Sequence, residues 1–198
     1  MREFWEKRYK NRDYAYGDRP NEFFKTFIDG VEPGRILLPA EGEGRNAVYA
    51  ANMGWEVDAF DFSLNARKKA LELARREGVS IDYLVADIEF HELGEEMYDV
   101  IALIHVHFSP ESRRYIHNKL VNSLRRGGFF ILEAFSPEHH QLLSGGPPDK
   151  RLLYDIADLK NDFADLEIET LYKQEIELDE GIYHQGPANV VRLVATKK

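Results

Sequence analysis

The feature of this sequence that most restricts its fold is an alternation of strand-like and helix-like segments. The expected strands are 35–38, 57–60, 81–85, 98–104 and 129–133, and the expected helices are 45–53, 64–77 and 111–124. Strands that are joined through helices pair in parallel, and the helices cover both faces of the sheet. The run Tyr98–Ile104 is almost wholly apolar, which is typical of a central strand.

The C-terminal part of the chain breaks this alternation. Two long strand-like segments, 166–178 and 189–196, are separated only by the connection 179–185. Because no helix lies between them, they are expected to form an antiparallel hairpin at the edge of the sheet. An irregular loop, 137–150, and a helix, 151–163, precede the hairpin. The sequence therefore predicts an α/β fold with seven strands, mostly parallel, and a C-terminal antiparallel hairpin.

The length of 198 residues fits one large domain. Within a single domain spanning 1–198, residues 35–198 are expected to form the ligand-binding core. Residues 1–30 are expected to be a helical, aromatic segment that serves as a lid or as a dimer surface. Trp5 and Tyr9 belong to this segment.

Composition narrows the functional classes. The formal net charge is -9, which argues against a nucleic-acid partner, although short basic runs occur at Arg67–Lys69 and Arg75–Arg76. These runs are expected to be solvated helix surface. The chain has no cysteine, which excludes a cysteine nucleophile, a disulfide and a thiolate metal site. No apolar run approaches the ~20 residues that span a membrane, and no signal segment is recognisable, so a cytoplasmic protein is expected.

The first expected strand runs directly into Gly42-Glu43-Gly44. Glycine allows a sharp turn and a close approach to a ligand. The helix that begins near Asn46 is expected to point its free amides and its dipole into the same space. Such a loop suits a nucleotide or a carboxylate. With Ala47 as a third small residue it also satisfies a dinucleotide-binding fingerprint, so the loop alone leaves both ligands open.

Two carboxylates stand at the ends of the next strands. Asp61 can accept hydrogen bonds from a ribose diol, and Asp87 can accept from an adenine amine. Phe62 and Ile88 can supply apolar faces for the ring. Alternatively, Asp87 caps a short helix that starts at Ile88, whereas Ser63 is the expected cap of the helix after Asp61.

Residues 38–49 (LPAEGEGRNAVY) resemble motif I of a subgroup of class I S-adenosylmethionine (AdoMet)-dependent methyltransferases that is akin to the tellurite-resistance methyltransferases. Further segments similar to this subgroup are 5–9, 16–17, 20–21, 61–63, 127–133, 145–147 and 180–186. The resemblance thus covers nearly the whole chain. It implies a Rossmann-like methyltransferase sheet, AdoMet as cofactor, and methyl transfer to a small-molecule acceptor by a monomer or homodimer.

The resemblance also implies which residues contact the cofactor: Tyr9, Tyr16, Ala40, Glu41, Gly42, Gly44, Asn46, Asp61, Phe62, Ser63, Asp87, Ile88 and Ile104. The chain departs from the family pattern at two positions. Many methyltransferases have an acidic residue where Leu38 stands and a glycine where Ala40 stands. Alanine fits if the turn keeps a negative φ. Glu41 and Glu43 either point outward, or one of them takes the amino group of the ligand.

Methyl transfer from a sulfonium is a direct displacement, so the protein mainly supplies alignment and shielding. A candidate for the acceptor pocket is His107, which matches a family histidine and is either a base or orienting donor or a structural histidine bonded to a backbone carbonyl. His105, Tyr183 and His184 are further candidates for this pocket, although a plain turn role for His184 is open.

No metal site is predicted, because His105 and His107 have no evident third ligand in the sequence. Arg113, His117 and Glu133 are expected to form an internal polar network or part of a site.

Two other functions remain open. An NAD(P)-dependent oxidoreductase fits the glycine loop, but the chain length, the terminal hairpin and the lack of a Tyr-x-x-x-Lys pair speak against it. A non-catalytic AdoMet-binding protein fits the same residues as an enzyme.

Overall fold

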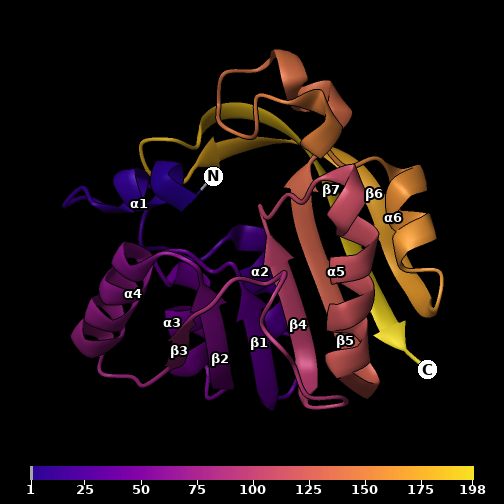
Figure 1. Cartoon of the computed structure of the whole chain (residues 1–198), viewed down its shortest axis with the longest axis horizontal. Helices are drawn as coiled ribbons and strands as arrows, with labels where there is room; N and C mark the ends of the chain where they lie inside the picture. The colour runs from indigo at the N-terminus through magenta and orange to yellow at the C-terminus, as the bar shows by residue number, and fades with distance from the viewer. Residues whose placement is uncertain (1) are drawn as a thin grey trace. The chain divides into compact units, whose positions relative to one another are not determined.

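The computed structural model describes residues 2–198 (Figure 1). The helices are α1 Arg2–Tyr9, α2 Glu22–Ile28, α3 Arg45–Asn52, α4 Leu64–Glu77, α5 Pro110–Ser123 and α6 Ile156–Asp162, with 3-10 turns η1 Pro137–Gln141 and η2 Lys150–Leu152. The strands are β1 Arg35–Pro39, β2 Glu56–Asp61, β3 Asp82–Val85, β4 Tyr98–Ile104, β5 Leu124–Phe135, β6 Leu166–Asp179 and β7 Gln185–Lys197. The strand order is β3-β2-β1-β4-β5-β7-β6. The predicted seven-stranded sheet is confirmed.

The chain divides into two compact units. The N-terminal unit comprises the described residues up to His91 together with Glu180–Tyr183, and the C-terminal unit comprises Glu92–Asp179 and His184–Lys198.

In the N-terminal unit, β1, β2 and β3 pair in parallel, with Leu38 opposite Ala59 and Ala59 opposite Tyr83. Because consecutive parallel strands need a crossover, α3 and α4 connect them and pack on one another and on the strands. The carboxyl ends of β1 and β2 therefore meet at one edge of this sheet, where ligands bind in open parallel sheets.

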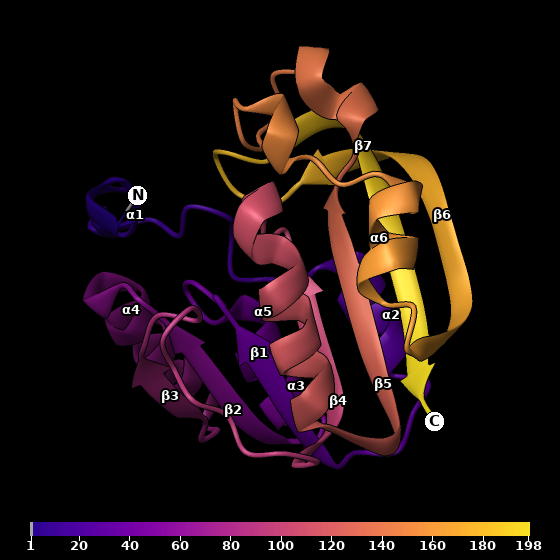
Figure 2. The same ribbon diagram turned by 45° about the vertical axis from the view of Figure 1, so that its right-hand side comes forward.

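In the C-terminal unit, β4 and β5 pair in parallel, whereas β7 runs antiparallel to both β5 and β6. Figure 2 shows β7 running beside β5, with β6 as the outer strand of the hairpin. Buried side chains such as Phe130 and Leu193 fill the interior between this sheet and its helices. The predicted C-terminal hairpin is confirmed.

Two local predictions are wrong. Gly127 and Gly128 lie inside β5, which already begins at Leu124, instead of forming the turn before it. The helix predicted from residue 151 begins only at Ile156, because Asp155 caps it by accepting from the Ala157 amide. Asp149 separately caps η2, so two caps divide the segment into two short helices, and the predicted irregular loop contains η1 and the start of η2.

The longest helices, α4 and α5, have 14 residues each. A bilayer requires about 20 apolar residues in one helix. Within residues 2–198, no helix combines the length and apolar character needed to cross a membrane.

Candidate functional site

The loop after β1 turns sharply at alternate residues. Ala40, Gly42 and Gly44 have φ values of 51°, 66° and 88°. The condition under which alanine would fit this turn without strain, a negative φ, is therefore not met. A left-handed conformation costs a residue with a Cβ about 1–2 kcal/mol, so this loop holds Ala40 in a strained state.

The two loop glycines have protein neighbours that explain them. A Cβ on Gly42 would lie 2.9 Å from the hydroxyl oxygen of Tyr9, and one on Gly44 would lie 2.6 Å from the Cβ of Ala70 in α4. Gly44 thus permits close packing of the loop on α4. Gly42 permits the N-terminal segment to lie against the loop, which places Tyr9 beside it.

Glu41 caps α3. Its Oε1 accepts hydrogen bonds from the amides of Asn46 (2.9 Å) and Ala47 (2.8 Å). The prediction that these amides are free to meet a ligand is therefore wrong. Burial raises the pKa of Glu41 to about 7, although the two amides and the charge of Arg45 act in the opposite direction.

The side chains of Asn46 and Glu43 face the N-terminal segment. Asn46 Oδ1 accepts from the amide of Asn21 at 2.9 Å, and Glu43 accepts from the amide of Ala15 at 2.7 Å and forms an ion pair with Lys69. Glu43 is buried. The alternative in which Glu41 and Glu43 point outward is therefore wrong, because both carboxylates bind protein groups.

Asp61 lies at the carboxyl end of β2 and is buried. Its Oδ1 accepts from the amide of Ser63 at 2.8 Å, and its Oδ2 accepts from the amide of Gly42 at 3.2 Å. Burial raises its pKa to about 6. Each carboxylate oxygen has two lone pairs, so this carboxylate can still accept two hydroxyl donors, as a ribose diol requires. Ser63 caps α4 through its hydroxyl, as predicted.

Asp87 caps the turn that follows it. Its Oδ1 accepts from the amide of Glu89 at 3.2 Å, and its backbone carbonyl accepts from the amides of Phe90 and His91. Of the two roles predicted for Asp87, the structure therefore has the capping role. A bond to adenine would be an additional contact, and Ile88, which is buried beside it, stays a predicted ring contact. Phe62 stays a predicted ring contact as well; it is partly exposed, with Arg2 over its face at 5.7 Å.

The N-terminal helix α1 lies near α4 (Figure 1), and the two helices are in contact. The carboxylate of Glu6 accepts from the amide of Leu64 at 2.7 Å, at the start of α4. Trp5 stacks on Tyr9 with ring centroids 5.4 Å apart. Tyr16 accepts a hydrogen bond from Arg8 at 2.8 Å.

Tyr183 lies in the same aromatic cluster as Trp5, Tyr9 and Tyr16. The guanidinium of Arg8 lies 3.8 Å from the centroid of the Tyr183 ring. The N-terminal segment and residue 183 thus form one surface of the N-terminal unit.

His107 is bound to the backbone through both ring nitrogens. Nδ1 donates to the carbonyl of Leu152 at 2.7 Å, and Nε2 accepts from the amide of Phe135 at 3.3 Å. Burial lowers its pKa to about 3, so the ring is neutral. The hypothesis that His107 is a base does not fit this geometry, because neither nitrogen has a lone pair or proton to offer. The structural alternative does fit.

His105 directly follows Ile104, the last residue of β4, and adopts an unusual φ of 55°. Its amide donates to the carbonyl of Glu133 at 2.7 Å, and its Nε2 lies 3.2 Å from Oε1 of Glu133. Its ring stacks on Phe135 with centroids 4.7 Å apart. Positive φ in a residue other than glycine is concentrated at functional sites, which singles out this position.

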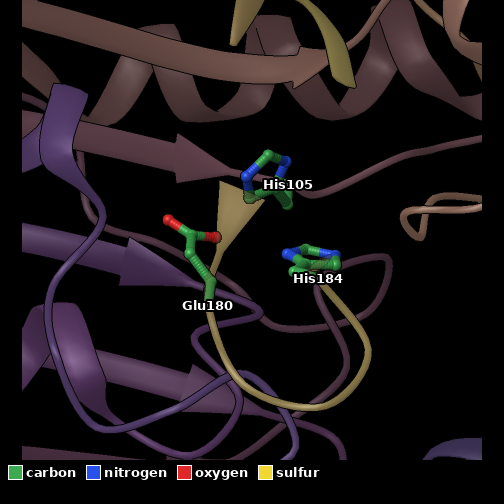
Figure 3. Close-up of side chains that lie close together, drawn as sticks. All are labelled: His105, Glu180 and His184. Carbon is green, nitrogen blue, oxygen red and sulfur yellow. The ribbon is translucent and has the colours of Figure 1, made fainter. Parts of the chain in front are cut away.

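His184 lies against His105. The two rings are 4.8 Å apart in a T-shaped arrangement, and both side chains are labelled in Figure 3. His184 is buried. Glu180, also labelled in Figure 3, belongs to the N-terminal unit, where it accepts from Asn21 Nδ2 at 3.0 Å and from Arg45 Nη2 at 2.9 Å.

Glu133 does not share a network with Arg113 and His117. Those two side chains bind Asp162, at 2.6 Å and 3.0 Å, and form a separate buried cluster. Glu133 instead pairs with Arg192, its cross-strand neighbour on β7. The pairing of β5 with the hairpin was the signal that could have identified this partner.

Residues 36–128 match the family model described as a methyltransferase domain. No curated protein matches the sequence. One similar solved structure is described by the conversion of a disulfide bond into a thioacetal group during echinomycin biosynthesis. It is 18% identical, with a TM-score of 0.82 over 100% of this chain and 92% of that chain.

Two further structures have the same fold. TehB from Haemophilus influenzae is 19% identical, with a TM-score of 0.75 over 100% of this chain and 67% of that one. Magnesium protoporphyrin IX methyltransferase from Synechocystis PCC 6803, with bound SAH, is 18% identical, with a TM-score of 0.69 over 89% and 80% of the two chains. Residues 36–128 are therefore similar to a methyltransferase domain, and the chain has the Rossmann-like fold of these structures, as its sequence resemblance predicts.

Proposed function

We propose that this protein binds AdoMet at the loop 40–46 and transfers its methyl group to a small-molecule acceptor. The observation that carries this proposal is the carboxylate of Asp61. It is buried at the end of β2 and is fixed by two backbone amides of Gly42 and Ser63. A ribose diol offers two hydroxyl donors to such a carboxylate and stabilises its charge.

Glu41 would hold the amino group of the cofactor. The position where many methyltransferases have an acid is Leu38, which is buried in β1 and cannot do so. Glu41 lies in the loop itself, and its elevated pKa reflects a partly buried, desolvated carboxylate that lacks a full counter-charge. An ammonium group beside it would supply that charge.

The cofactor, when bound, supplies a methyl group on a positively charged sulfur. The work of the chain is then to align the acceptor and exclude water. Tyr9 and Tyr16, held together with Trp5, would cover the loop as a lid. Glu6 fixes this segment to α4.

The acceptor pocket would include His184 and His105, which lie against one another in the C-terminal unit. We favour His105 over His107 for contact with the acceptor, because His107 is bound to the backbone through both nitrogens. An acceptor that is already ionised, such as a thiolate or a chalcogen oxyanion, would need no base. We infer no nucleic-acid or membrane partner, a monomer or homodimer, and, from the absence of cysteine, a cytoplasmic setting.

Methyl transfer from radiolabelled AdoMet tests this function. The purified chain is incubated with a panel of thiols, tellurite, selenite and small amines. Transfer to at least one acceptor is expected, with strong loss in the Asp61→Asn variant and no loss in Asp82→Asn, an exposed carboxylate on β3. AdoMet binding without transfer to any acceptor would instead favour a non-catalytic AdoMet-binding protein.

A further inference from the structure

A cleft of about 560 Å³ lies in the N-terminal unit, between α4 and the segment that follows α1. Its size falls within the range of roughly 300–1,000 Å³ that is usual for small-molecule pockets. One wall is a face of α4 on which Asn65, Lys68, Glu72 and Arg75 follow one another at helical spacing. The other wall is formed by residues 10–12 and Tyr14.

The side chains around this cleft are mostly cationic. They include a single carboxylate, Glu72, against these cations: Lys10, Arg12, Lys68, Lys69, Arg75 and Arg76. The chain as a whole carries a net charge of -9, so this local excess of positive charge runs against the overall balance. A cleft lined by one sign of charge concentrates the electric field and attracts ions of the opposite sign.

Two of the cations fix the shape of the cleft. Lys69 forms an ion pair with Glu43 and donates to the backbone carbonyls of Asn11 (3.0 Å) and Asp13 (2.6 Å), which ties the second wall to α4. Arg76 pairs with Asp18 at 2.6 Å. The walls are thus held in place by the protein itself, and no ligand is needed to form them.

The other four cations are available to bind a ligand. Lys10, Arg12, Lys68 and Arg75 are exposed, and across the described part of the chain none of their side chains has an ion pair or hydrogen bond. Single solvated lysines and arginines are ordinary on a protein surface. Four of them around one concave surface repel one another, and a bound anion would relieve that repulsion.

The spacing of these cations indicates the kind of anion. Seven residues separate Lys68 from Arg75, which corresponds to about 10 Å along the helix axis. Lys10 and Arg12 lie on the facing wall. A linear anion with several charged groups can contact all four side chains, and arginine binds phosphate oxygens in a bidentate manner. We propose that this cleft binds a small molecule that carries a chain of phosphate groups. This site adjoins the proposed AdoMet site at Tyr9, which lines the cleft, but its four anion-binding cations are not part of that site.

Calorimetric titration of the full chain with sodium tripolyphosphate at low salt tests the proposal. Saturable binding to one site is expected. The double variant Lys68→Ala/Arg75→Ala should weaken it by at least about tenfold, the ratio that corresponds to 1.4 kcal/mol. A matched control, Arg114→Ala/Lys160→Ala, removes two exposed cations of the C-terminal unit and should change the affinity less than about twofold, since distant charges are screened.

Several outcomes would overturn the proposal. Equal weakening in both double variants would show a response to net charge only, and absence of saturable binding would show that the cleft has no ligand of this class. Orthophosphate binding as tightly as tripolyphosphate would contradict the need for a chain of phosphates. Tighter binding of a ten-nucleotide single strand than of tripolyphosphate would show that the ligand of the cleft is a nucleic acid and not a small molecule.

Discussion

Nε2 of His105 lies 3.2 Å from Oε1 of Glu133, a carboxylate that is fully buried. The second oxygen of Glu133 accepts from Nε of Arg192 at 2.6 Å. Burial alone would raise the pKa of Glu133, but the contacts with His105 and Arg192 hold it below its usual value. The carboxylate is therefore ionised at neutral pH and orients the ring of His105, whose backbone leaves β4 at a positive φ.

Replacement of Glu133 by glutamine is expected to destabilise the protein by about 3 kcal/mol at pH 7, because Arg192 loses its counter-charge in a buried site. The pKa of Glu133 is lowered on folding, so its stabilising contribution is present above pH 4.5, the ordinary pKa, and is lost as the pH falls through the folded value. Chemical unfolding of wild type and Glu133→Gln at pH 7 and in acid measures this. Glu175→Gln, an exposed change on β6, is the control. Equal stabilities of Glu133→Gln and wild type at pH 7 would refute the pairing.

Asp61 is expected to change the stability of the fold with pH in the direction opposite to Glu133. Its pKa rises from 3.8 to about 6 on folding, so the folded state binds a proton more tightly than the unfolded state. Stability contributed by this group therefore falls as the pH rises from about 4 to about 6. The Asp61→Asn variant should be more stable than wild type at pH 7, by up to about 3 kcal/mol, and should bind AdoMet more weakly, because an amide offers one acceptor oxygen. Thermal unfolding and calorimetry test both halves, with Asp82→Asn as control. A variant that is less stable and binds equally well would contradict this account.

Binding of AdoMet is expected to release protons from the carboxyl group of Glu41. With a pKa of about 7, roughly half of its carboxyls are neutral at pH 7 in the ligand-free protein. An ammonium group beside it favours the charged form, so AdoMet binding should release about half a proton at pH 7. Titrations in buffers with different heats of ionisation measure this release. The Glu41→Gln variant, whose side-chain oxygen can still cap α3, should release much less, since only the roughly one tenth of Asp61 that is protonated at pH 7 remains to be ionised. Binding heats of the wild type that do not depend on the buffer would place the amino group elsewhere.

Gly44 and Gly78 offer a matched comparison, because both adopt a left-handed φ, 88° and 74°. A Cβ at Gly44 would lie 2.6 Å from that of Ala70, whereas one at Gly78 would meet nothing within 4 Å. Gly78→Ala should therefore cost about 1–2 kcal/mol from backbone strain alone. Gly44→Ala should cost about 1–3 kcal/mol more from overpacking. Urea unfolding of both variants decides the point, since similar losses would mean that α4 yields without cost.

Local signals account for the elements that could be predicted from the sequence. The helix α4 has the predicted bounds, because Ser63 caps its first turn and Gly78 ends it in the left-handed conformation. Both signals lie within a few residues of the helix end they determine. The strand β4 was equally predictable from its continuous apolar run.

Tertiary contacts account for what could not be predicted. Gly127 and Gly128 resemble a turn, yet they lie within β5. The caps made by Glu41 and the pairing of Glu133 with His105 join residues whose proximity depends on the folded loop and on strand pairing. For His107 the residue type suggested chemistry, and only the positions of Leu152 and Phe135 show that its ring is bound to the backbone.

We propose AdoMet as the ligand of the loop 40–46, whose glycines alone permit either AdoMet or a nicotinamide dinucleotide. Parallel calorimetric titrations of the wild-type chain and of Asp61→Asn with AdoMet and with NADH test it most directly. We predict saturable one-to-one binding of AdoMet, weakened by Asp61→Asn, and much weaker or absent binding of NADH. Tighter binding of NADH than of AdoMet, or AdoMet binding that is indifferent to Asp61, would contradict the account.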